Sequence, residues 1–232
     1  MKYTFFIVIL TLKSLIASSQ LLMVVSNDWN STTAQLQRYE RVNNTFVSVG
    51  KKIDVNLGRS GLGWSDSEVN LSKNKSEPQK REGDGRAPAG VFYITGSFGY
   101  FDTPNKKVPY LHSNSELICV DDVNSSAYNT ITPRALAKEA KSFELMRRDD
   151  DLYELGLTLS HNNKRVPYYG SCVFLHVEKF KGAPTSGCTS MSKQNLQTLI
   201  KWLDISKKPL LIQVPKLYHL EAMKLFSDLH AL

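Results

Sequence analysis

The sequence predicts a mainly-β fold with appended helices. Many short runs alternate apolar and polar residues, as half-buried strands do, and few segments show helical spacing. This balance indicates one mainly-β domain with helices attached to it. Hydrophobic residues make up 41% and charged residues 22% of the 232 residues. Both values are ordinary for a globular protein, so neither disorder nor a fibrous class is expected.

Residues 1–19 are predicted to be a secretory signal peptide. Lys2 gives the segment a positive start, and residues 5–12 are apolar apart from one threonine. Ala17 and Ser19 fit the small-x-small pattern of a cleavage site.

The alternative for this segment is an uncleaved membrane anchor. Its apolar run is shorter than the ~20 residues that cross a bilayer, so cleavage before Gln20 is favoured. We therefore expect one domain over residues 20–232, without stable membrane insertion. The corresponding location is the periplasm or the cell envelope, to which the protein would be exported.

The charge is moderately basic. The formal net charge is +7, and removal of Lys2 and Lys13 with the signal peptide would leave +5. An exported protein of this charge suits a polyanionic surface, such as a cell wall or a membrane face. A nucleic-acid partner is not expected, because no basic helix, zinc-finger spacing or aromatic RNA-binding signature is visible.

The predicted strands are short and bounded by turn residues. Asn43 and Asn44 separate two alternating runs, which indicates a hairpin. Residues 58–67 are glycine-rich and 68–89 highly polar, so both are expected to form loops. Strands are predicted at residues 20–25, 36–41, 46–49, 53–57, 91–95, 117–120, 155–161, 173–177 and 210–214.

Three helices are predicted. Thr132 and Pro133 fit an N-cap and a first helical residue, which places a helix over residues 134–148. Residues 192–204 carry apolar side chains at 3- and 4-residue spacing, and residues 216–230 form a last amphipathic helix. The residues expected to face inward in that last helix are Leu217, Leu220, Met223, Phe226 and Leu229.

The chain has an odd number of cysteines. In an exported protein cysteines tend to pair, so three cysteines leave one thiol over. Cys119 and Cys172 lie in short apolar runs, whereas Cys188 lies in a turn of small residues. We therefore expect a disulfide between Cys119 and Cys172 and a free Cys188. The alternative that all three are reduced stays open.

Cys188 and His176 are the candidate nucleophile and base. His176 ends an apolar run, and Cys188 follows twelve residues later, just before a predicted helix. A helix N-terminus and a nearby histidine both favour a thiolate. The histidine could act first as base and then as acid, and the N–H groups of Gly187 and Cys188 could stabilise an oxyanion. On spacing alone, a structural role for the pair is the more common outcome.

Two further residues are candidates for lining a cleft. His161 lies on one face of a strand with leucines, and a structural role is as plausible there as a cleft role. Ser171 lies shortly before the His176 strand. No His/Cys/Asp spacing resembles a zinc site, so neither a metal nor a cofactor is expected.

Three segments resemble one known family. Residues 185–191 (TSGCTSM), together with His176 upstream, resemble the signature of the L,D-transpeptidase (YkuD-like) catalytic domain. Residues 80–92 (KREGDGRAPAGVF) resemble the family segment in which T/S-P-x-G-x-F opens a central strand. Residues 170–176 (GSCVFLH) resemble the G-S-x-I-F-L-H form of a subgroup with short spacing. The resemblance covers roughly residues 20–215.

This resemblance implies a β-sandwich-like catalytic domain that acts on peptidoglycan stem peptides. Cys188 would attack the carbonyl of the L-centre residue in a tetrapeptide donor, with His176 as base and Gly187 in the oxyanion hole. The terminal D-amino acid would leave, and an acceptor amine would resolve the thioester.

The sequence departs from the family pattern at three positions. Thr185 and Ser186 stand where many members have serine and histidine, and Ser190 stands where many have arginine. That arginine would order the site or contact a substrate carboxylate. Thr185, Ser186 and Ser190 are therefore the further candidates for lining the cleft.

Other functions stay open at this point. An L,D-carboxypeptidase would use the same nucleophile and base but resolve the thioester with water. A non-catalytic wall-binding module could have kept the fold. A thiol oxidoreductase is a weaker alternative, because the sequence has no C-x-x-C pair.

Overall fold

One large β-sheet makes up most of the fold. The computed structural model describes residues 18–43, 45–69, 71, 74 and 76–228. The strands of this sheet are β1 (Gln20–Ser26), β2 (Thr33–Val42), β3 (Thr45–Asn56), β4 (Leu62–Trp64), β5 (Ala87–Gly99), β6 (Tyr110–His112), β10 (Leu155–Leu159), β11 (Phe174–Val177), β12 (Thr189–Met191) and β13 (Leu210–Pro215). Within the described residues its order is β10-β11-β12-β3-β2-β1-β13-β5-β4, with β6 paired to β5.

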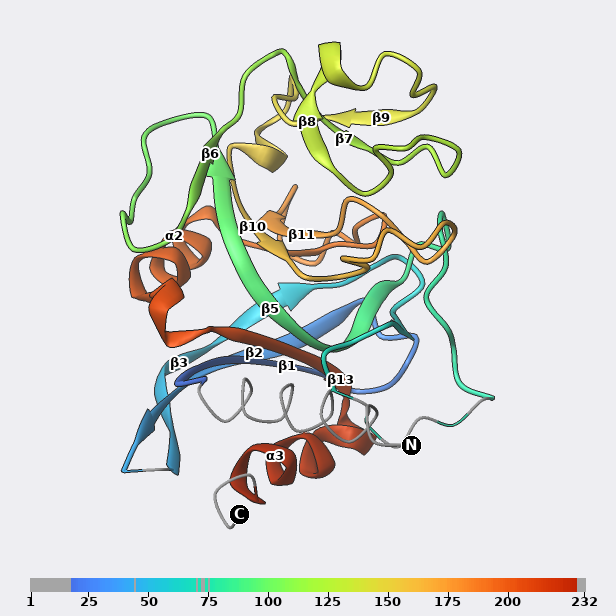
Figure 1. Ribbon diagram of the computed structural model, residues 1–232. Helices are drawn as coiled ribbons and strands as arrows, with labels where there is room; N and C mark the ends of the chain where they lie inside the picture. The colour runs from blue at the N-terminus through green and yellow to red at the C-terminus, as the bar shows by residue number, and fades with distance from the viewer. Residues whose placement is uncertain (1–17, 44, 70, 72–73, 75, 229–232) are drawn as a thin grey trace, which may run out of the picture.

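The sheet curls back to meet itself. β10 pairs antiparallel with β11 and also with the long strand β5, which crosses the centre of the molecule (Figure 1). The mainly-β prediction is thereby confirmed. The predicted hairpin is also confirmed, since β2 and β3 pair antiparallel on either side of Asn43, whose φ is +48°.

The main core lies around β1, β5 and β13. β1 runs parallel to β13 and antiparallel to β2, so both its edges are covered. Leu21 and Leu22 point to opposite faces of the strand, and both are fully buried, as is Val24. A continuous apolar run of this kind suits a strand that is covered on both faces.

A second, small sheet lies above β10 and β11 in Figure 1. Its strands are β7 (Leu117–Val120), β8 (Ile131–Pro133) and β9 (Phe143–Leu145), in the order β8-β7-β9. A disulfide between Cys119 of β7 and Cys172 joins this small sheet to the segment just before β11. The expected cysteine pairing is confirmed, and Cys188 is unpaired.

The predicted helix over residues 134–148 is wrong. Pro133 ends β8 in an extended conformation instead of starting a helix, and a single 3-10 turn follows, η1 (Arg134–Leu136). Leu136, at the end of this turn, is 75% exposed. The chain then returns as β9, which pairs antiparallel with β7. Pairing with a distant strand therefore outweighs the local helical spacing.

The predicted helix over residues 192–204 is confirmed with slightly shorter bounds. α2 (Lys193–Trp202) begins after Ser192, whose side-chain oxygen accepts a hydrogen bond from the Asn195 N–H at 3.3 Å. Leu196, Leu199 and Ile200 form its buried face. Short 3-10 turns stand before β10 and before β13, namely η2 (Asp151–Tyr153) and η3 (Ile205–Lys207).

The last predicted helix exists, but its inward face differs. The chain first makes a 3-10 turn, η4 (Lys216–Tyr218), and then α3 (His219–Asp228). Leu217 and Leu220 are 76% and 72% exposed, whereas Tyr218 and Ala222 are buried. The tighter 3-10 turn shifts the phase of the helix against the expected spacing. The side chains of Phe226 and Leu229, also predicted to face inward, lie outside the described ones.

The predicted signal peptide lies almost wholly outside the described residues. Only its last two residues, Ser18 and Ser19, belong to the described part. In the described ranges, no helix is long and apolar enough to cross a membrane. The domain boundary at Gln20 stays a prediction.

Candidate active site

Two neighbouring strands bring Cys188 and His176 into one pocket. β11 and β12 pair in parallel, with His176 opposite Ser190. Cys188 is the residue just before β12, so the chain that leads into this strand places its thiol beside the start of β11. The thiol accepts a hydrogen bond from the Phe174 N–H at 3.4 Å, which fixes it against the β11 backbone.

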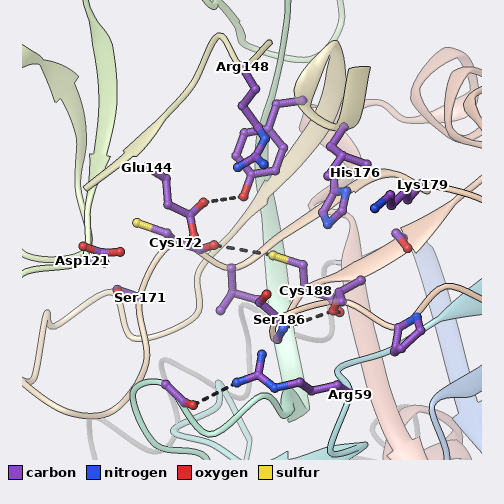
Figure 2. A pocket seen from close by; sticks show the side chains of 18 of the residues that line it. Arg59, Asp121, Glu144, Arg148, Ser171, Cys172, His176, Lys179, Ser186 and Cys188 are labelled. Carbon is purple, nitrogen blue, oxygen red and sulfur yellow. Dashed lines mark hydrogen bonds between the residues drawn. The ribbon is translucent and has the colours of Figure 1, made fainter. Parts of the chain in front are cut away.

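The pocket has a volume of about 460 Å³. His176 and Cys188 lie in its wall together with most, but not all, of the residues of the predicted motif, and Figure 2 shows the side chains of His176 and Cys188 from close by. The predicted site residues in this lining are Ser171, His176, Thr185, Ser186, Gly187, Cys188 and Ser190. The charged residues in it are Arg59, Lys80, Glu82, Asp121, Glu144, Arg148 and Lys179.

The Cys188 thiol is protonated in the resting site. The side chain is 8% exposed, and the sulfur donates to the carbonyl oxygen of Cys172 at 3.6 Å. Burial raises the pKa of Cys188 to about 12, and the negative charge of Glu144 adds to the rise. The expected activation by a helix N-terminus is not seen, because β12 separates Cys188 from α2, which begins at Lys193.

His176 is held as a neutral base. Its Nδ1 lies 2.7 Å from the carbonyl oxygen of Val177. A carbonyl only accepts, so Nδ1 carries the proton and Nε2 keeps its lone pair. Burial lowers the pKa of His176 to about 4, although the Val177 carbonyl favours the charged form. The ring of Tyr153 packs edge-on against the imidazole, with centroids 5.4 Å apart.

Thr185 organises the turn that carries Cys188. Its hydroxyl donates to the Cys188 carbonyl at 2.7 Å and accepts from the Gly187 N–H at 3.1 Å. Gly187 has φ +148°, a conformation that other residues rarely adopt. The Gly187 N–H is therefore engaged inside the turn, whereas the Cys188 N–H has no hydrogen-bond acceptor among the described residues.

A carboxylate, a phenol and a guanidinium form the wall opposite this turn. The Tyr153 hydroxyl donates to Glu144, and the Arg148 guanidinium lies 5.2 Å from the centre of the Tyr153 ring. Arg148 also pairs through two nitrogens with Asp150, at 2.8 and 2.9 Å. Burial raises the pKa of Glu144, and the charge of Asp121 raises it further. This wall thus combines a carboxyl group of raised pKa, Glu144, with a guanidinium held in place by Asp150, that of Arg148.

Sequence reasoning missed this wall. Glu144 was expected inside a helix, and its place on β9 depends on pairing with β7. Arg148 follows β9 and therefore reaches the pocket for the same reason. No local sequence signal marked either residue, since the contacts join segments far apart in the chain.

The serine candidates have different surroundings. The Ser171 hydroxyl donates to Glu82 at 2.9 Å. Ser190 is 1% exposed and accepts from the Asn56 side chain at 3.3 Å, so it belongs to the sheet interior as well as to the pocket wall. Ser186 is exposed at the pocket mouth.

His161 lies outside the pocket lining. It is 3% exposed, and its ring packs edge-on against Phe92 at a centroid distance of 5.8 Å. Neither ring nitrogen has a hydrogen-bond partner among the described residues. Burial lowers the pKa of His161 to about 3, and the nearby charge of Lys80 lowers it further. The structure thus places it as a buried neutral residue behind the site.

A metal centre is not apparent in the part of the chain that the structure describes. No group of three or more His, Cys, Asp or Glu side chains there could hold a metal ion.

A thiol and an imidazole in one shielded pocket are the groups with which cysteine-dependent acyl-transfer enzymes work. The sequence matches the family model of the L,D-transpeptidase catalytic domain (YkuD) over residues 16–212, so the chain belongs to that family. The resemblance inferred from the motifs is thereby confirmed, while the short-spacing subgroup stays a prediction. No curated protein and no solved structure matches the chain significantly.

Proposed function

We propose that this protein is an exported L,D-transpeptidase that acts on peptidoglycan stem peptides through a thioester on Cys188. The observation that carries the proposal is the shared pocket of Cys188 and His176 in a chain of this family. The disulfide between Cys119 and Cys172 supports export, because such bonds persist in oxidising compartments.

Both partners are neutral at rest, so the proton moves during the reaction. Nε2 of His176 takes the thiol proton as the sulfur attacks the carbonyl of the L-centre residue in the donor peptide. The tetrahedral intermediate then collapses, and the imidazolium gives its proton to the departing amine of the terminal D-residue. This leaves a thioester on Cys188 and a neutral His176.

The second half of the reaction uses the same groups in reverse. The nitrogen of an acceptor amine attacks the thioester carbonyl, and His176 takes a proton from that amine. The sulfur leaves with a proton from the imidazolium, which restores the thiol and completes the new amide bond. The backbone N–H groups of Gly187 and Cys188 are the proposed donors to the oxyanion in both steps. Of the two, that of Cys188 is the unengaged one within the described structure.

The test is incubation of the purified protein with muropeptides, analysed by mass spectrometry. Cross-linked dimers, lost in Cys188→Ala, are the expected products. Trimmed tripeptides alone would indicate the carboxypeptidase alternative, in which water resolves the thioester. No product together with an unchanged cellular muropeptide profile in Cys188→Ala would indicate a non-catalytic wall-binding module.

Covalent labelling tests the nucleophile separately. A carbapenem-type β-lactam is expected to acylate the wild-type protein once, at Cys188. A folded wild-type protein that gains no adduct would contradict the thioester mechanism.

A further inference from the structure

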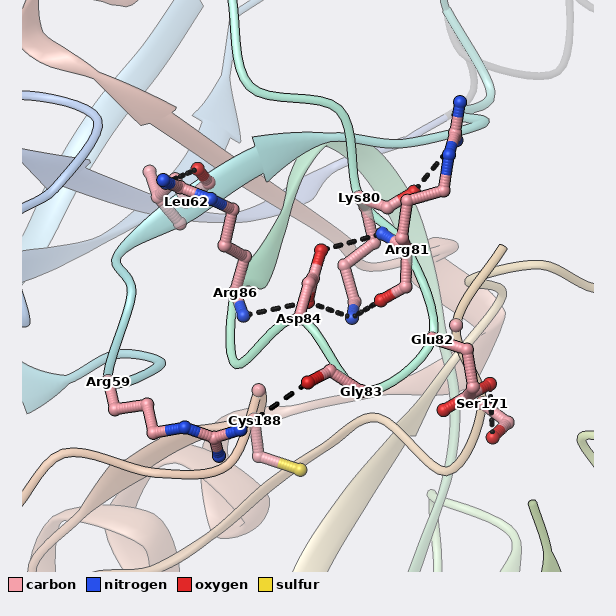
Figure 3. Close-up of polar contacts among 12 residues, drawn as sticks. Arg59, Leu62, Lys80, Arg81, Glu82, Gly83, Asp84, Arg86, Ser171 and Cys188 are labelled. Carbon is pink, nitrogen blue, oxygen red and sulfur yellow. Dashed lines mark hydrogen bonds and ion pairs between the residues drawn. The ribbon is translucent and has the colours of Figure 1, made fainter. Parts of the chain in front are cut away.

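A buried lysine lies behind the catalytic turn. Lys80 is 4% exposed, although lysine is rarely fully buried without a partner. Its partner is Asp84, whose carboxylate accepts from the Lys80 Nζ at 2.7 Å (Figure 3). The same carboxylate accepts from the N–H groups of Arg81 at 2.6 Å and Arg86 at 2.8 Å. The turn around Asp84 therefore fixes the position of the ammonium.

Two glycines without side chains, Gly170 and Gly187, lie next to the Lys80 ammonium at the pocket. A Cβ atom built on Gly187 would lie 3.9 Å from the Lys80 Nζ, and one built on Gly170 would lie 3.3 Å from it. Both glycines have positive φ, so neither position suits a larger residue. Lys80 is itself part of the pocket lining. Its charge therefore lies directly beside the residue that precedes Cys188.

One N–H of this ammonium is unused. A lysine ammonium has three donors, and two of them go to Asp84 and to the Arg81 carbonyl at 2.6 Å. The third has no acceptor among the described residues. The turn itself offers little else to an oxyanion, because the Gly187 N–H already donates to Thr185. The site thus holds one unengaged backbone donor, at Cys188, and one unengaged cationic donor.

The buried ion pair of Lys80 and Asp84 is not expected to add much to the stability of the fold. Moving two charges out of water is unfavourable, and apolar replacements of buried pairs are often neutral or stabilising. In a shielded pocket, however, a fixed positive charge stabilises nearby negative charge far more than it would in water.

We propose that Lys80 stabilises the negative charge that develops at the Gly187–Cys188 turn during acyl transfer. The charge forms first on the sulfur and then on the carbonyl oxygen of the tetrahedral intermediate. Asp84 is the positioning residue that holds the ammonium in place. This assignment rests on the proposed acyl-transfer function.

The test compares two double variants. Lys80→Met with Asp84→Asn removes the buried pair without changing the net charge. The matched control is Lys164→Met with Asp66→Asn, which removes an exposed pair 3.8 Å apart, with the lysine 75% and the aspartate 46% exposed. The readouts are kcat and KM for muropeptide transfer, the rate of Cys188 alkylation by iodoacetamide at pH 8, and the thermal midpoint.

The buried-pair variant is expected to fold with a midpoint near that of the wild type. Its kcat should fall by about 10²-fold, the effect of losing one oxyanion donor, with KM little changed. Cys188 alkylation should slow as well. The control variant should match the wild type in all three readouts.

Three results separate the possibilities. A buried-pair variant with wild-type kcat and alkylation rate would overturn the assignment. So would a single Lys80→Met variant whose loss of activity is reversed by adding Asp84→Asn, since that pattern means the pair only supports the fold. If the wild type transfers nothing, the proposed function fails, and the alkylation rates alone decide whether Lys80 acts on the thiolate.

Discussion

The thiol of Cys188 donates to the carbonyl oxygen of Cys172, 3.6 Å away. Cys172 is bonded to Cys119 of β7, so Cys172 contacts both its disulfide partner and the Cys188 thiol. Cys172 also has φ +52°, a left-handed conformation that is uncommon for residues other than glycine. The small sheet thus helps to fix the backbone to which the Cys188 thiol is hydrogen-bonded.

Removal of the disulfide should weaken both the fold and the site. Replacing Cys119 and Cys172 by serine frees a loop with a sequence separation of 53, which should lower the free energy of unfolding by about 2–4 kcal/mol. Cys188 should also react faster with iodoacetamide, because its surroundings loosen. Urea unfolding and thiol alkylation measure the two effects. A double variant with wild-type stability and alkylation rate would show that the small sheet is held by other contacts.

The hydroxyl of Thr185 should matter more than its methyl group. Thr185→Val removes the bonds to the Cys188 carbonyl and the Gly187 N–H, whereas Thr185→Ser can keep both. Two lost hydrogen bonds at about 1 kcal/mol each correspond to a fall in kcat of roughly tenfold or more. Steady-state transfer kinetics would show the valine variant slowed and the serine variant close to wild type. Equal rates in the two variants would mean that the turn keeps its shape without the hydroxyl.

The sequence was most informative where structure is local. An alternating run predicted β10, an apolar run predicted β11, and the spacing of leucines predicted α2. The odd number of cysteines and their positions predicted the disulfide and the free thiol. The segment after Pro133 had helical spacing as well, yet it pairs as β9 with the distant strand β7, for example Leu145 with Ile118. When a segment forms a strand only because it pairs with a distant strand, its own residues carry no pattern that predicts the strand. The inward face of α3 was misassigned for a related reason, since a 3-10 turn precedes it.

The same distinction applies to the site. His176 and Cys188 lie twelve residues apart and were predicted together as candidates. Glu144, Arg148 and Lys80 reach the pocket from β9, from the segment after it and from a turn before β5. Each therefore depends on how distant segments pack, and the charge pattern of the pocket could not be read from any single stretch.

Neutralising Glu144 should make the Cys188 thiol easier to ionise. The Glu144 carboxylate is the second cause, after burial, of the raised pKa of Cys188. Glu144→Gln keeps an acceptor for the Tyr153 hydroxyl but removes the negative charge, so the pKa of Cys188 should fall. The rate of iodoacetamide alkylation measured against pH should then rise at lower pH than in the wild type.

A matched variant separates this effect from a change in overall charge. Glu116→Gln removes the same charge from an exposed position outside the pocket lining and should leave the profile unchanged. Identical profiles for Glu144→Gln and the wild type would mean that solvent screens the carboxylate from the thiol.

Two buried histidines should make stability depend on pH below neutrality. The pKa of His161 is lowered to about 3 and that of His176 to about 4, both mainly by burial, from an ordinary value of 6.5. Between about pH 4 and 6.5 the unfolded chain therefore binds more protons than the folded one, and stability must rise with pH. Each histidine should contribute about 1.4 kcal/mol per pH unit in the middle of this window.

His161→Phe isolates one half of this dependence. The new ring suits the apolar contact with Phe92 and removes two ring nitrogens that have no partner within the described structure. The free energy of unfolding from urea titrations should then rise less steeply between pH 4.5 and 6 than in the wild type. The difference between the two slopes cancels the contributions of the acidic residues, which both proteins share. Because His161 lies outside the pocket lining, muropeptide transfer at pH 7 should be retained. Equal slopes would mean that His161 is protonated in the folded protein, against the effect of its burial.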